Sequence, residues 1–112
     1  IIMPKFNSAG KLVRRKGTNF FDKVSVSSTN FSNHTASWDF MSHGIFIMVE
    51  SSYLSDIIQY SFDGSEVHGD LTPRLPSEAI IFDNRYLNQI WFRQASSGPP
   101  IIVRIEAWRN DA

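Results

Sequence analysis

The chain has 112 residues, no cysteine and a formal net charge of zero. This length allows one domain with a modest core, and the 42% hydrophobic content excludes a chain that is disordered by composition. The lack of cysteine excludes disulfides and thiolate metal sites, which fits assembly in a reducing cytoplasm, and no apolar run approaches the roughly 18 residues of a membrane helix.

The basic residues are unevenly placed. Five of them, and no acidic residue, lie in the first 17 positions: Lys5, Lys11, Arg14, Arg15 and Lys16. From Thr18 onward eleven acidic residues outnumber six basic ones. We therefore expect a basic N-terminal arm at residues 1–17 and a folded domain at residues 18–112.

The arm has two interpretations. It is either a solvated terminus or a segment that docks, through Arg14, Arg15 and Lys16, on the acidic surface of a neighbouring copy or another partner. Nucleic acid is not expected as a partner, because the arm has few interleaved aromatic residues and the acidic body would repel phosphate.

After the arm, short runs with strand character alternate with turn-forming segments. Ser27–Thr35 and Met41–Gly44 are predicted breaks, and Asp63-Gly64 predicts a tight hairpin turn. Ile45–Glu50 is apolar at both parities, which predicts a central strand that is covered on both sides. The strands expected in this part are Phe20–Val26, Ala36–Phe40, Ile45–Glu50, Ile57–Phe62 and Glu66–Leu71.

The last third of the chain has the clearest pattern. Three more strands are predicted there, at Ala79–Phe82, Gln89–Arg93 and Ile101–Trp108. Strict alternation in the last one places Ile101, Val103, Ile105 and Ala107 on one face, and Ile102, Arg104, Glu106 and Trp108 on the other. This period of two is typical of a half-buried β-strand.

Seven to nine short strands at spacings near ten residues, with no apolar period of 3.6, predict an all-β fold. We expect a compact antiparallel β-sandwich that resembles a jelly roll. The expected core consists of Val24, Val26, Ile45, Ile47, Val49, Ile58, Tyr60, Phe62, Ile80, Phe82, Ile90, Phe92, Ile101, Val103 and Ile105.

The C-terminal half resembles a known group of proteins. The pattern resembles small β-sandwich or jelly-roll virion proteins of tailed bacteriophages, which decorate heads or build necks and tails. It is carried by Tyr60-Ser61-Phe62-Asp63-Gly64, Val67-His68-Gly69-Asp70-Leu71, Asp83-Asn84-Arg85, Ile90-Trp91-Phe92-Arg93 and Val103-Arg104-Ile105-Glu106-Ala107-Trp108. The resemblance implies a non-enzymatic protein that is assembled in many copies in the virion.

Two tryptophans are the candidate interface residues. Trp91 with Arg93, and Trp108 with Arg104, are predicted to point away from the core, and they share one exposed face if their strands are adjacent. A buried Trp removes about 150–250 Å² from water, so something should cover them. The cover is a partner protein, the rest of the same chain, or a ligand that stacks on the rings.

No catalytic, cofactor or metal site is predicted. Asp83-Asn84-Arg85 is interpreted as a turn, from which Arg85 pairs with Asp83 or reaches a partner. His34 and His43 are expected in loops and His68 on a strand face, without the spacing of metal ligands. The carboxylates between Asp56 and Glu78 form no pattern that selects an acid–base pair.

The resemblance implies, and we expect, a non-enzymatic virion protein that binds copies of itself and a larger capsid, neck or tail protein. It would be assembled in the host cytoplasm and would need no cofactor, membrane or small-molecule substrate. The alternative is a carbohydrate-binding or host-recognition module that uses Trp91 or Trp108 as a platform for a sugar.

Overall fold

The computed structural model describes residues 5–6, 12–13, 18–51, 53, 55–73, 79–83 and 85–109. The described chain is built of β-strands, with one turn of 3-10 helix, and confirms the expected all-β class. None of its helical segments is long and apolar enough to cross a membrane. The strands are β1 (Lys5–Phe6), β2 (Leu12–Val13), β3 (Thr18–Val26), β4 (Thr35–Ser42), β5 (Gly44–Glu50), β6 (Ile58–Ser61), β7 (Gly69–Leu71), β8 (Ala79–Phe82), β9 (Leu87–Gln94) and β10 (Ile101–Arg109), and the 3-10 turn η1 is Phe31–Asn33.

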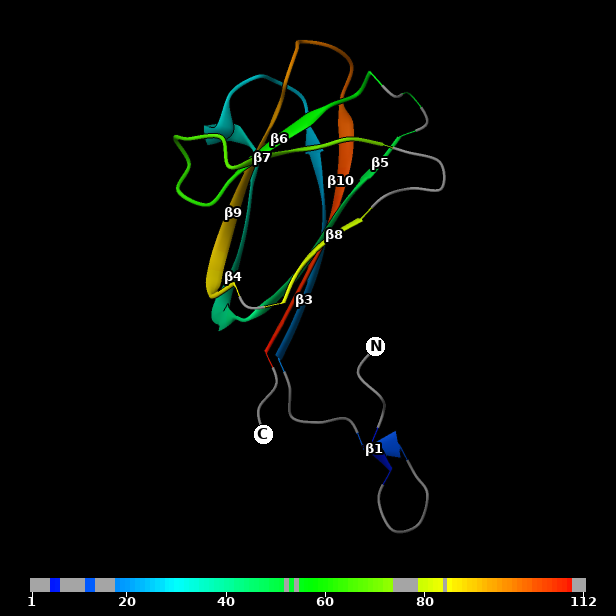
Figure 1. Cartoon of the computed structure of the whole chain (residues 1–112), viewed down its shortest axis with the longest axis vertical. Coiled ribbons are helices and arrows are strands. Elements are labelled where there is room, and N and C mark those ends of the chain that lie inside the picture. The colour runs from blue at the N-terminus through cyan, green and yellow to red at the C-terminus, as the bar shows by residue number, and fades with distance from the viewer. Residues whose placement is uncertain are drawn as a thin grey trace.

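Two four-stranded antiparallel sheets form the sandwich (Figure 1). One sheet has the order β3-β10-β5-β8 and the other the order β4-β9-β6-β7. Counted from β3, the first strand pairs with the eighth, the second with the seventh, the third with the sixth and the fourth with the fifth. A long hairpin that is rolled up on itself produces this pairing, so the sandwich has the topology of a jelly roll.

The core lies between the two sheets. Alternation on β10 places Ile101, Val103, Ile105 and Ala107 inward, as predicted, and all four are buried. Each of the other sandwich strands, except β8, also contributes buried side chains to this core: Val26, Ala36, Trp38, Phe40, Ile45, Ile47, Val49, Ile58, Tyr60, Leu71, Ile90 and Phe92.

Four residues of the expected core are only partly buried: Val24, Phe62, Ile80 and Phe82. Val24 lies on β3 and the last two on β8, and these are the edge strands of one sheet, where the sandwich opens to solvent. The sequence analysis omitted Trp38, Phe40 and Leu71, which fill the interior instead.

Three local predictions are corrected. The break at Met41–Gly44 is narrower than expected, because β4 continues to Ser42 and β5 begins at Gly44. The turn after β6 is wider than a two-residue hairpin, because the return strand β7 begins only at Gly69. As a result, His68 lies in this connection and not on a strand face.

The N-terminal arm is described only at two short strands. Lys5–Phe6 and Leu12–Val13 pair antiparallel in a two-stranded sheet of their own. The predicted docking residues Arg14, Arg15 and Lys16 lie outside the described residues.

Candidate interaction surface

The outward side of the sheet β3-β10-β5-β8 is the candidate surface, and we call it the β10 face. The backbone pairing builds it in rows. Glu106 has Phe21 on one side and Phe46 on the other, and in the next row Arg104 lies between Lys23 and Met48. β8 adds Ile81 beside Phe46. The outward residues that define the face are Phe21, Lys23, Phe46, Met48, Glu50, Ile81, Ile102, Arg104, Glu106 and Trp108.

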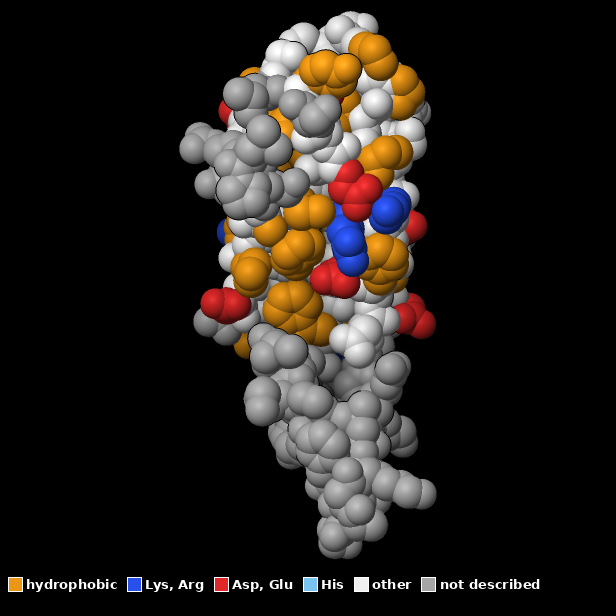
Figure 2. Space-filling view, turned by 90° about the vertical axis from the view of Figure 1, so that its right-hand side faces the viewer, with side chains coloured by type: hydrophobic (Ala, Val, Ile, Leu, Met, Phe, Trp, Pro, Cys, Tyr) orange, Lys and Arg blue, Asp and Glu red, His pale blue; other side chains and the backbone are white. Residues whose placement is uncertain are grey.

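Large apolar side chains are open to solvent on this face. Phe21 is 51% exposed and Ile81 is 56% exposed, while Phe46, Met48 and Trp108 are half-buried. Figure 2 shows hydrophobic side chains gathered around a small charged cluster. The predicted cover on both sides of β5 is therefore present only on its core side, since the outward side carries no second layer within the described chain.

The charged cluster at the middle of the face is balanced in sign. Nζ of Lys23 lies 3.2 Å from a carboxylate oxygen of Glu50. The guanidinium of Arg104 is farther from its acidic neighbours, 4.0 Å from Glu50 and 3.9 Å from Glu106, and it also lies over the ring of Phe21 at 4.9 Å. Partly exposed pairs at these distances are weak, so the cluster adds little to the stability of the fold.

Arg104 is incompletely satisfied. Its Nε atom is buried and has no hydrogen-bond partner among the described residues. A guanidinium has five donors, and an unsatisfied buried donor costs about 1–3 kcal/mol. The Arg104 side chain is 38% exposed, and its terminal nitrogens, not Nε, are the atoms that an acceptor outside the sheet can reach.

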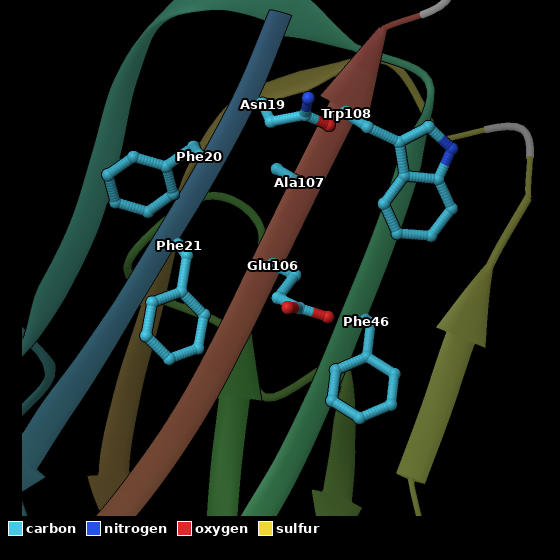
Figure 3. A pocket seen from close by; sticks show the side chains of 7 residues that line it. All are labelled: Asn19, Phe20, Phe21, Phe46, Glu106, Ala107 and Trp108. Carbon is cyan, nitrogen blue, oxygen red and sulfur yellow. The ribbon is translucent and has the colours of Figure 1, made fainter. Parts of the chain in front are cut away.

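A shallow groove of about 510 Å³ crosses one end of the β10 face, and its lining includes Asn19, Phe21, Phe46, Glu106 and Trp108. In Figure 3 the carboxylate of Glu106 lies between the rings of Phe21 and Phe46, with Trp108 and Asn19 beyond it. The indole of Trp108 lies directly on Gly44, where an added Cβ would come within 2.1 Å of the ring. Aromatic walls around one carboxylate and one amide suit an apolar or mixed contact.

The two tryptophans would share a face only if β9 and β10 were adjacent, and the structure does not meet this condition. β9 and β10 follow each other in the chain but belong to different sheets, so Trp91 and Trp108 lie on opposite outer faces. The inward positions of Ile90 and Phe92 were predicted correctly, since both are buried. Local alternation shows which side chains point outward, but it does not show which sheet contains the strand.

Trp91 and Arg93 are partly covered by their own chain. Gly64 lies so close to the indole of Trp91 that an added Cβ would be 2.9 Å from it. Nε of Arg93 donates a hydrogen bond of 2.7 Å to the Gln59 side chain, and its guanidinium lies 4.4 Å over the ring of Phe31. Of the two tryptophan–arginine sets, only Arg104 and Trp108 belong to the apolar surface.

The outer side of the sheet β4-β9-β6-β7, which we call the β9 face, is mainly polar. On β4, Thr35, Ser37 and Asp39 alternate outward with the buried core residues. Gln59 and Arg93 continue this character across the sheet. The β9 face also carries Met41, which is 49% exposed at the end of the outward row of β4. The two faces therefore differ in degree: polar side chains prevail on the β9 face, and apolar side chains surround the charged cluster of the β10 face.

The β6–β7 connection brings three possible metal ligands together. Ligand atoms of Asp63, Glu66 and His68 lie within 4.8 Å of one another, and all three residues are exposed. However, Oδ1 of Asp63 already accepts the backbone N–H groups of Ser65 and Glu66, each at 2.9 Å, and these bonds hold the pKa of Asp63 well below its ordinary value. Nδ1 of His68 accepts the N–H of Phe62. These groups stabilise the loop, as capping side chains do.

The remaining candidates have structural partners. His34 is buried before β4, where Nε2 accepts the Ser27 N–H at 3.0 Å, so Nδ1 is the protonated nitrogen and donates to the carbonyl of Asn30. Arg85 lies 4.3 Å over the ring of Phe62, and its predicted contact with a partner stays a prediction. Asn84 of the predicted turn lies outside the described residues.

Sequence reasoning missed Phe21, Phe46 and Ile81 as surface residues. The signal was present in their parity, because Phe21 alternates with core-facing residues on β3 and Phe46 does so on β5.

Comparison with known proteins identifies no relative of this chain. No family model matches it, and no curated protein or solved structure is significantly similar to it.

Proposed function

We propose that this protein is a non-enzymatic structural protein of a phage virion, assembled in multiple copies in the host cytoplasm. Its partners would be copies of itself and a larger capsid, neck or tail component. The β10 face is the single observation that carries the proposal. Its exposed Phe21 and Ile81, beside Phe46 and Trp108, form a large apolar surface of the kind that marks interaction sites.

The jelly-roll topology and the resemblance of the C-terminal half to virion proteins support the same function. The topology alone does not define a function, because jelly rolls also occur in lectins and enzymes. A symmetric assembly explains how a small domain would bind firmly, because many weak contacts act together when each copy is held by several neighbours.

The test is the mass of the purified protein in solution, measured by light scattering behind a sizing column over a series of protein and salt concentrations. We expect a defined oligomer. Ile81→Asp should lower the association constant about tenfold or more, because it buries a carboxylate among apolar side chains at the contact. Ser37→Asp on the β9 face is the matched control and should leave the mass unchanged.

A carbohydrate-binding module is the second candidate, favoured by the groove with Trp108, Glu106 and Asn19. A wild-type protein that stays monomeric at every concentration would contradict self-assembly. Saturable binding of a glycan by that monomer, lost in Trp108→Ala, would support this second function instead.

A further inference from the structure

We propose that two copies of this chain pair through their β10 faces about a two-fold axis. The axis lies midway between the two faces, runs perpendicular to the strands and passes over Ile105. This pairing rests on the proposed function, and it is the contact through which one copy binds another. Such an axis reverses the strand direction while it places each strand opposite its own equivalent. The contact is then isologous: if one residue touches another, the reverse contact is also made.

The charges of the face determine the position of the axis. Along β10, Arg104 and Glu106 point outward on either side of the inward Ile105. An axis over Arg104 would oppose two cations, and an axis over Glu106 would oppose two carboxylates. An axis over Ile105 places Arg104 of each copy opposite Glu106 of the other, so that both pairs are attractive.

The same operation gives complementary contacts on the flanking strands. It reflects the row of Glu106 onto the row of Arg104, so Phe46 of one copy meets Met48 of the other, an apolar contact. On β3, Phe21 meets Lys23 of the second copy, which is a contact between an aromatic ring and a cation. Packed sheets are rotated by about 30°, so these two rows of each copy, which lie nearest the axis, contribute most.

The incomplete satisfaction of Arg104 points the same way. Its terminal nitrogens lie 4.0 Å from Glu50 and 3.9 Å from Glu106, which is too far for a hydrogen bond. A carboxylate of a second copy would accept from this guanidinium, and a charge-assisted hydrogen bond is about twice as strong as a neutral one.

Other arrangements of two copies are less favourable. An axis parallel to the strands and over β10 would oppose Arg104 to itself. An axis shifted to lie between β10 and β5 would press Arg104 and Glu106 against Met48 and Phe46, which buries charges without partners. Pairing through the β9 face would remove water from Ser37 and Asp39, and it would leave the apolar side chains of the β10 face in water.

Charge reversal tests this geometry. Arg104→Glu alone places two carboxylates opposite each other in both symmetry-related pairs, and Glu106→Arg alone places two cations there. We expect each single variant to have a dimer dissociation constant about 100-fold or more above that of the wild type. An equimolar mixture of the two variants should form a heterodimer, because every pair across the contact is again of opposite sign.

The double variant Arg104→Glu with Glu106→Arg should also dimerise by itself. Asp39→Arg on the β9 face is the control for added positive charge and should dimerise like the wild type. Circular dichroism and thermal unfolding establish that each variant is folded.

A second measurement does not depend on charge. The chain has no cysteine, so single cysteines report only the chosen contact. A mixture of Phe46→Cys and Met48→Cys should form disulfide-linked heterodimers faster than either variant alone forms homodimers. If the wild type self-associates but neither the charge variants nor the cysteine pair respond, the two-fold pairing is wrong while self-assembly stands. A wild type that never associates overturns both.

Discussion

At the scale of single residues, Gln94 is the polar group on which the core depends most. It is 1% exposed at the end of β9. Its amide donates to the carbonyls of Val26 and Pro99, at 2.9 and 2.7 Å, and accepts the N–H of Gly98 at 2.9 Å. One side chain therefore ties the β9–β10 connection to the end of β3.

Replacement of this side chain should destabilise the fold. Gln94→Ala leaves the carbonyls of Val26 and Pro99 and the N–H of Gly98 without their partner, and we expect a loss of about 1–3 kcal/mol in the free energy of unfolding. Chemical denaturation measures it. Gln89→Ala, on the same strand but outward and half-buried, is the matched control. Equal losses in the two variants would contradict the assigned role of Gln94.

The sequence predicted the burial of Ile90 and Phe92 on β9, but not the burial of Gln94 on the same strand. Ile90 and Phe92 were expected inside because their apolar side chains mark the inward parity of β9. Gln94 has the same parity, but a polar residue at the end of a strand resembles the start of a loop. Its burial depends on carbonyl groups that are 68 and 5 positions away in the chain, and only the tertiary structure brings them together.

At the scale of elements, the β6–β7 connection shows how a tertiary contact overrides a local turn signal. Asp63-Gly64 predicts a two-residue hairpin, yet β7 begins only at Gly69. The longer loop allows Gly64 to lie against the indole of Trp91 with a φ of 82°. The loop thereby covers a tryptophan that would otherwise be exposed on the β9 face.

Gly64 should consequently tolerate no side chain. Gly64→Ala introduces a Cβ that is 2.9 Å from the ring of Trp91, at a backbone conformation that disfavours other residues. We expect a loss of about 1–3 kcal/mol in stability, measured by thermal unfolding, together with greater solvent exposure of Trp91 in fluorescence quenching.

Gly98 provides the comparison for this change. An added Cβ at Gly98 would meet nothing within 4 Å, so Gly98→Ala should change the stability by no more than about 0.5 kcal/mol. A Gly64→Ala variant as stable as Gly98→Ala would show that the loop moves freely and that Trp91 does not need its cover.

At the scale of the whole molecule, the strand order explains why the surface was only half predictable. From β3 to β6 each strand crosses to the other sheet, and the same happens from β7 to β10. Parity along β9 and β10 showed correctly that Trp91 and Trp108 point outward. The crossing between sheets, which depends on long-range pairing, then places them on opposite sides of the molecule.

The contrast between the two faces also follows from this order. β10 lies between β3 and β5, and both of these neighbours place a phenylalanine beside Glu106. β9 has β4 beside it, which presents Ser37 and Asp39 outward. An assembly that buries the β10 face would leave the β9 face in water.

The N-terminal arm contributes no side chain to the buried core of the described chain, which is formed by residues between Val26 and Ala107. Removal of residues 1–17 should therefore leave the sandwich folded, with the circular dichroism spectrum of the full chain. If the arm docks on a neighbouring copy, the truncated protein should associate more weakly in light scattering.

A full-length variant separates the charge of the arm from its length. Neutralising Arg14, Arg15 and Lys16 together as glutamine should weaken association to a similar extent if attraction to the acidic body is the cause, and the loss should fade at high salt because exposed charges are screened. If truncation unfolds the sandwich, the arm is part of the fold. If neither change affects the mass, the β10 face is sufficient for pairing, and the arm has no part in it.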